Sequence, residues 1–179
     1  MFDKSFEYRL IQKRKSNEYG VLNEHIYDFN STKRRYIVLV EEYDHLVFVP
    51  KFYPSAYRDS PNRFNIILND FEAARIIRTC INITLDLLKA NPEASFAFMG
   101  ASTKSTNKTE TKVLTQRFII YRKLMLNFFN KSLWMHFDDI DTSTYLLIPF
   151  NKIDKAEYTR KVIQMFVDIY PDLDNVVFP

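Results

Sequence analysis

The segment from Gly100 to Thr106 places a lysine beside serine and threonine, between an apolar run and a helical pattern, as phosphate-binding loops do. Such a loop requires a glycine directly before the lysine, because only glycine lets backbone amides wrap closely around a phosphate. Thr103 stands there instead, before Lys104. The sequence therefore argues against nucleotide hydrolysis and predicts a solvated loop.

Basic side chains gather in and after this loop. Residues 101–131 carry seven basic and one acidic side chain, whereas residues 132–179 carry four and eight. A basic surface of this kind contacts a phosphate backbone or an acidic protein, and exposed aromatic side chains stack on bases. The candidate binding residues are Lys104, Lys108, Lys112, Arg122 and Lys123, with Lys33, Arg34 and Arg35 as a second patch and Tyr53 and Tyr57 as stacking candidates.

Three aspartates form an acidic bend after His136. Asp138, Asp139 and Asp141 are the residue types with which a hydrolytic nuclease holds a divalent cation. Aspartates in a hairpin turn also bond to their own backbone. The sequence favours the turn, and a metal-dependent nuclease is the third functional hypothesis.

The remaining reactive side chains do not form a known catalytic pattern. His25, His45 and His136 stand in different contexts, without metal-ligand spacing between them. Cys80 is the single cysteine, which excludes an internal disulfide, and its place on an apolar helix face is typical of a core residue. No nucleophile-elbow or zinc-protease motif is present. We therefore expect no catalytic residue, no metal and no cofactor.

A long helix is the clearest element of the sequence. It is predicted to begin at Asp70, which with Asn69 offers an N-cap oxygen, and to end at Asn91, before Pro92. Apolar residues at helical spacing give it one buried face. They are Ala73, Ile76, Ile77, Cys80, Leu87 and Leu88.

A strand, a loop and a second helix are predicted to follow. Ala94–Met99 is a short apolar run typical of an inner strand, and Ala101–Thr109 is a polar loop. Asn107 and Glu110 have capping-box spacing, which predicts a helix start. The apolar stripe of this helix comprises Val113, Leu114, Phe118, Tyr121, Leu124, Met125 and Phe128.

Strand patterns and a third helix complete the chain. Asp154 is predicted to cap this helix and Pro171 to end it. We expect one α+β domain, an antiparallel sheet of about six or seven strands with three helices packed on it. Its parts are a strand-rich half (1–69), a helix-strand-helix unit (70–130), and a hairpin with a C-terminal helix (131–179). The predicted strands are 6–13, 19–29, 35–42, 46–49, 63–68, 94–99, 133–137 and 144–150.

The order of the predicted elements is accompanied by a set of residues at characteristic places. They are Asp70, Arg75, Ile76 and Thr79, Asn91 and Pro92, Arg117 and Arg122, and Tyr145-Leu146-Leu147-Ile148. On these residues the layout over roughly 60–170 resembles small uncharacterised bacterial domain-of-unknown-function families. The resemblance implies a bacterial origin, and these families supply no activity that can be transferred.

Composition limits the functional classes. A hydrophobic content of 46% with 16% aromatic residues indicates a folded chain. The absence of a long apolar run and of a signal-peptide pattern predicts a cytoplasmic protein without a membrane partner.

The leading hypothesis is a non-enzymatic bacterial protein-interaction module, within a phage-defence or toxin-antitoxin system, that binds a protein partner or a second copy of itself. Its basic segment would attract an acidic surface of the partner by electrostatic steering. The alternative is nucleic-acid binding through the basic loop and helix at 101–131.

Overall fold

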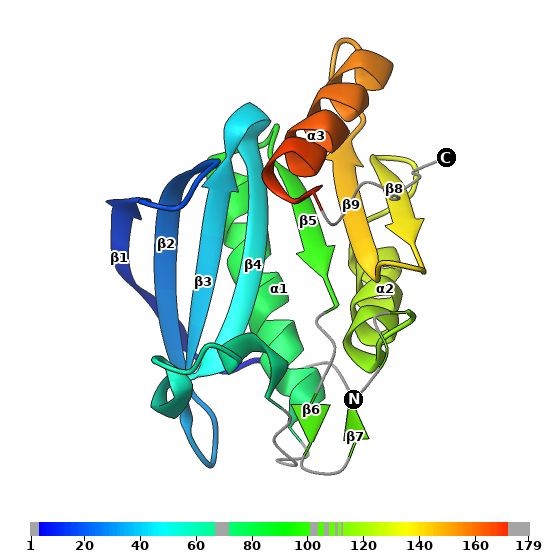
Figure 1. Ribbon diagram of the computed structural model, residues 1–179. Coiled ribbons are helices and arrows are strands. Elements are labelled where there is room, and N and C mark those ends of the chain that lie inside the picture. The colour runs from blue at the N-terminus through cyan, green and yellow to red at the C-terminus, as the bar shows by residue number, and fades with distance from the viewer. Residues whose placement is uncertain are drawn as a thin grey trace.

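The computed structural model describes residues 4–66, 72–100, 104–105, 108–109, 111 and 113–171. These residues form a seven-stranded sheet, in the order β1-β2-β3-β4-β5-β9-β8, and a small two-stranded sheet of β6 and β7. Figure 1 shows α1 and α2 on one face of the large sheet and α3 on the other. The predicted α+β class, with a mostly antiparallel sheet and three helices, is confirmed.

The described part of the chain contains nine strands, three α-helices and three short 3-10 helices. The strands are β1 Tyr8–Lys15, β2 Val21–Asn30, β3 Arg35–Tyr43, β4 Val47–Pro54, β5 Ser95–Met99, β6 Lys104–Ser105, β7 Lys108–Thr109, β8 Trp134–Asp139 and β9 Thr144–Pro149. The helices are α1 Ala73–Ala90, α2 Gln116–Phe128 and α3 Lys155–Ile169, and the 3-10 turns are Asp44–Leu46, Ser55–Tyr57 and Arg63–Asn65.

The sheet contains one parallel pairing. Strands β1 to β4 form an antiparallel meander. Helix α1 then crosses over to β5, which lies parallel to β4, because parallel neighbours require a crossover connection. The two strands pair only where Val47 lies opposite Ser95 and Phe48 opposite Phe96. Beyond these pairs, β4 keeps its partner β3 and β5 keeps its partner β9.

Side-chain alternation divides the core between the two faces of the sheet. On β4, Phe48 packs into the larger cluster beneath α1 and α2, whereas Val47 and Val49 belong to a smaller cluster beneath α3. Helix α1 contributes the fully buried Ile83 to the larger cluster, and α3 contributes Val162 to the smaller one. The face beneath α3 therefore has the thinner core.

The structure corrects one predicted strand. The segment Arg63–Leu68 was expected to be extended, but Arg63–Asn65 forms a 3-10 turn. The guanidinium group of Arg63 lies over the rings of Tyr53 and Phe64, so contacts within the chain favour a compact turn at this point.

The second helix also starts later than predicted. It begins at Gln116, where Thr115 is the N-cap and its side chain accepts a hydrogen bond from the amide of Phe118. Asn107 and Glu110, the predicted capping box, lie outside the described residues, as does Asp70, the predicted cap of the first helix. The cap of the third helix is confirmed, because the side chain of Asp154 accepts from the amide of Glu157.

Within the described residues, no helix is both long enough and apolar enough to cross a membrane.

Candidate functional site

The second basic patch lies at the turn between β2 and β3. Arg35 forms an ion pair of 2.6 Å with Asp28, a carboxylate that also binds Arg9 at 2.9 Å. Lys33 and Arg34 occupy the turn itself. Arg35 is thus held by a buried carboxylate of its own sheet. The negative charge of Asp28 offsets part of the positive charge that Arg35 would present to a binding partner.

Of the two stacking candidates, Tyr53 is buried. Only 7% of it is exposed, and its ring packs edge to face on Phe64 at a centroid distance of 5.3 Å. The predicted stacking role is wrong for Tyr53, because the 3-10 turn carrying Phe64 folds over it. Tyr57 is exposed, as the prediction requires.

The basic residues of the second helix have different environments. Arg122 reaches across to strand β8 and pairs with Asp138 at 2.7 Å, whereas Lys123 lies on the exposed face of α2. The side chains of Lys104, Lys108 and Lys112 lie outside the described residues. Helix α2 packs on β5 and β9, so the sheet order separates it from the turn between β2 and β3.

The acidic bend is used for structure. Asp138 holds Arg122, and the side chain of Asp139 accepts a hydrogen bond from the amide of Thr142. As neighbours on a strand, Asp138 and Asp139 point to opposite faces. Within the described residues, no three His, Cys, Asp or Glu side chains come together as a metal site.

The histidines and the cysteine are placed apart from one another. His25 lies 2.8 Å from a carboxylate oxygen of Glu42, and Nδ1 of His136 lies 2.6 Å from the hydroxyl of Tyr145. Cys80 lies in the core, where burial raises the pKa of its thiol to about 12. Cys80 is therefore protonated at neutral pH, which fits the expected core role.

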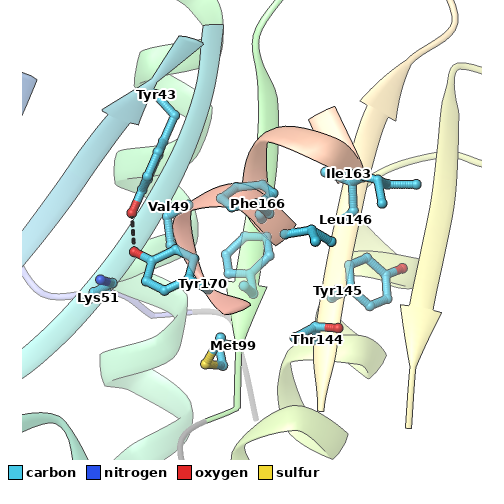
Figure 2. Close-up of a pocket in the computed structure, with 13 residues that line it drawn as sticks. Tyr43, Val49, Lys51, Met99, Thr144, Tyr145, Leu146, Ile163, Phe166 and Tyr170 are labelled. Atoms are coloured by element: carbon cyan, nitrogen blue, oxygen red, sulfur yellow. Dashed lines mark hydrogen bonds between the residues drawn. The ribbon is translucent and has the colours of Figure 1, made fainter. Parts of the chain in front are cut away.

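A cavity with a mainly apolar lining lies beneath α3. Its volume is about 180 Å³, and it lies between the helix and strands β3, β4, β5 and β9 (Figure 2). The lining residues are Tyr43, Val49, Lys51, Ala97, Phe98, Met99, Thr144, Tyr145, Leu146, Ile163, Phe166, Val167 and Tyr170.

Two features of the fold leave this space open. Strands β4 and β5 are not paired at Lys51 and Met99, which both line the cavity. On α3, Ile163, Phe166 and Val167 remain partly exposed although they line the cavity. The helix therefore covers the sheet without filling the space below it.

A chain of polar groups closes one end of the cavity. The carboxylate of Glu41, only 2% exposed, lies 2.6 Å from the ammonium group of Lys51. The hydroxyl of Tyr43 donates to the same carboxylate at 2.6 Å and lies 2.6 Å from the hydroxyl of Tyr170 (Figure 2). Tyr43, Lys51 and Tyr170, from β3, β4 and the end of α3, line the polar end of the cavity, and Glu41 holds Tyr43 and Lys51 without lining it.

The hydrogen bonds of this polar end have a fixed direction. Burial, reinforced by the charge of Glu41, raises the pKa of Tyr43, so its phenol keeps its proton and donates it to the carboxylate. A hydroxyl has only one proton to give, so Tyr43 accepts the hydrogen bond from Tyr170. The oxygen of Tyr170 is left with acceptor capacity, and the ammonium group of Lys51 has N–H donors beyond the one directed at Glu41.

Sequence reasoning missed this site. The available signal was Glu41, an acidic residue that continues the run of strand-forming residues Tyr36–Val40. The register places Val49 opposite Glu41 and Lys51 opposite Leu39, so the cation reaches the acid diagonally. Tyr170 is distant in sequence, and no local pattern joins it to Tyr43.

No protein-family model matches this chain, and neither the curated proteins nor the solved structures contain a significant match. The resemblance to uncharacterised bacterial families therefore stays a prediction.

Proposed function

We propose that this chain is a binding domain whose cavity beneath α3 holds a small molecule with a ring-sized apolar body and an uncharged hydrogen-bonding end. The observation that carries the proposal is the apolar cavity of about 180 Å³ closed by a polar end. Apolar cavities of about 150 Å³ bind a molecule of benzene. A single ring with one short substituent matches the space.

The charge at the polar end supports an uncharged substituent. Lys51 already balances Glu41, and a carboxylate or phosphate entering the cavity would compete with Glu41 for that cation. An uncharged hydroxyl or primary amide avoids this competition. It can donate to the oxygen of Tyr170 and accept from Lys51, because these groups offer an acceptor and a donor.

Titration with three matched probes, followed by amide chemical shifts and calorimetry, tests the proposal. Benzyl alcohol should bind with a dissociation constant on the order of 1 mM, toluene more weakly, and benzoate weakest of all. The shifts should concentrate at Val49, Leu146 and Ile163. If none of the probes shifts these residues, the proposal fails.

A variant that fills the cavity, compared with the same substitution on the surface, tests where the probe binds. Ala97 lines the cavity, so Ala97→Leu should occupy the space and abolish binding. Ala156→Leu makes the same change at an exposed position on α3 and should leave binding unchanged. Tyr170→Phe should reduce the preference for benzyl alcohol over toluene by about 5- to 10-fold, which corresponds to one hydrogen bond. Equal binding by wild type and Ala97→Leu would contradict the assignment.

The protein-interaction role expected from the sequence remains a second candidate. The observation that favours it is a group of exposed apolar side chains beside strand β8, among them Ile119, Leu126, Leu133 and Ile140. Nucleic-acid binding through 101–131 stays a prediction, since most of that loop lies outside the described residues. Its test is the double variant Lys108→Glu with Lys112→Glu, which should weaken binding and its salt dependence.

A further inference from the structure

The two edges of the sheet differ in how they are protected. Natural edge strands avoid pairing with other chains through bulges and charged side chains. Strand β1 has both, with a register irregularity between Leu10 and Gln12 and four basic residues in eight. Strand β8 has a regular register over its whole length and contains no lysine or arginine, and its charged residues are the aspartates Asp138 and Asp139 at its end. Within the described residues its one strand partner is β9, so one edge of β8 has no strand neighbour there, although the amide of Trp134 already donates to the carbonyl of Asn130 at 3.0 Å.

Exposed apolar side chains surround the β8 edge. Leu133, just before the strand, is 63% exposed, and Ile140, just after it, is 47% exposed. On α2, the exposed Ile119 and Leu126 share a helix face with Arg122, the residue that reaches β8. The edge thus has apolar side chains at both ends and along the helix beside it.

Charge along this edge is self-complementary. Lys131 precedes the strand and Asp141 follows it, and both are exposed. When two identical strands pair antiparallel, the start of each lies near the end of the other. Lys131 of one copy would then approach Asp141 of the second, and Leu133 would approach Ile140.

We propose that the β8 edge is a dimer interface, occupied by β8 of a second copy of this chain in antiparallel orientation. The contact is isologous, because the same surface is used by both copies. It joins the two seven-stranded sheets into one and removes the exposed β8 edge. It uses a part of the molecule other than the cavity, so its test is independent of the proposed ligand binding. It names a second copy of the chain as the partner in the protein-interaction role given above as the second candidate.

The mass of the full chain in solution tests the assembly. Light scattering after size-exclusion chromatography, at concentrations up to the order of 100 µM, should give twice the chain mass of 21.4 kDa at the upper end. Leu133→Asp and Ile140→Asp should each raise the dissociation constant at least about tenfold. Ile11→Asp, at a 46% exposed position on the β1 edge, is the matched control and should leave it unchanged.

A charge exchange tests the orientation of the strands. Lys131→Glu and Asp141→Lys should each weaken the dimer, because each places like charges opposite one another across the interface. The double variant restores opposite charges and should recover most of the affinity. A double variant as weak as the product of the two single effects would overturn the antiparallel arrangement.

Hydrogen exchange locates the contact directly. The amides within Trp134–Asp139 that do not donate to β9 should become more protected as protein concentration rises, while those of Tyr8–Lys15 should not change. A chain that stays monomeric over the whole concentration range would overturn the proposal. So would a dimer whose concentration-dependent protection lies on β1.

Discussion

Only two glycines occur in the chain, and both stand where a Cβ atom would meet another part of the protein. At Gly100, an added Cβ would lie 2.4 Å from the Thr115 hydroxyl oxygen and 2.9 Å from the amide nitrogen of Phe118. That hydroxyl caps α2 and also donates to the carbonyl of Gly100 at 2.9 Å. A single residue therefore fixes how closely the end of β5 approaches the start of α2.

Gly100→Ala should destabilise the fold by about 2–4 kcal/mol, since it combines overpacking with damage to a helix cap. Urea unfolding of the purified variant measures the change. Gly20→Ala is the comparison. Gly20 has a φ of +78°, which costs a side-chain-bearing residue about 1–2 kcal/mol, but the nearest atoms belong to the Ile169 side chain and not to backbone. The substitution at position 100 should be the more costly one, and the reverse order would contradict the assigned role of the cap.

At the scale of elements, α1 and α3 differ in how completely they pack. Helix α1 buries eight residues, including Ile83 at 0% exposed, whereas Val162 is the one fully buried residue of α3. The reason lies in the sheet, because β4 and β5 separate beneath the C-terminal half of α3. A helix placed over this separation has fewer side chains to pack against.

Truncating the same residue type on the two helices should show this difference. Ile83→Ala should cost about 2–5 kcal/mol, as expected for a fully buried isoleucine. Ile163→Ala should cost less than about half as much, because Ile163 is partly exposed and already borders a cavity. Urea unfolding measures both, and equal losses would show that α3 is packed as tightly as α1.

Ile163→Ala should also enlarge the cavity. Under the proposed function it should then bind a bulkier probe, such as 1-naphthalenemethanol, better than the wild type does, while Ile83→Ala should not. Calorimetric titration of both variants makes the comparison.

At the scale of the whole molecule, ion pairs cover the part of the sheet that α3 leaves open. This part lies on the same face of the sheet as α3, over the strands at the β1 end. Asp28 holds Arg9 and Arg35, and Glu24 holds Arg14 at 2.7 Å. Both acids are buried while the arginine ends are exposed, so the long side chains cover the sheet and leave their charges in water. The arginine side chains thereby shield from solvent the part of this face that no helix covers.

These ion pairs should make the free energy of unfolding depend on pH in the acidic range. The hydrogen bond from Arg9, followed by that from Arg35, holds the pKa of Asp28 below its ordinary value of 3.8. A group with a lowered folded pKa stabilises the fold fully above its unfolded pKa, and this contribution disappears as the pH falls through the folded value. Asp28→Asn should therefore cost about 1 kcal/mol near pH 7, a modest amount because solvent screens the arginines.

The cost of Asp28→Asn should shrink as the pH falls from about 4 to about 2. Unfolding free energies measured across this range, with exposed Asp59→Asn as the control, test the assignment. A cost for Asp28→Asn that does not change with pH would show that charge is not the source of the stabilisation.

The sequence alone determined the elements whose stabilising contacts are local. Helical spacing from Ala73 onward predicts α1, the cap at Asp154 predicts α3, and the acidic bend after Phe137 predicts the hairpin of β8 and β9, because each pattern depends on residues within a few positions of one another. The same reasoning gave the α+β class. It failed at the start of α2, where the cap depends on Gly100, a residue from another element.

Only the tertiary structure decided the candidate site. The hydroxyls of Tyr43 and Tyr170 meet across 127 residues of sequence, and the space beside them exists because β4 and β5 pair at only two positions. The tertiary structure also decided which basic side chains are free to contact a partner. In the sequence, Arg35 and Arg122 cannot be distinguished from the exposed Lys123, but in the fold they are held by Asp28 and Asp138. Pairings between distant residues depend on strand order and register, and these follow from packing the whole chain.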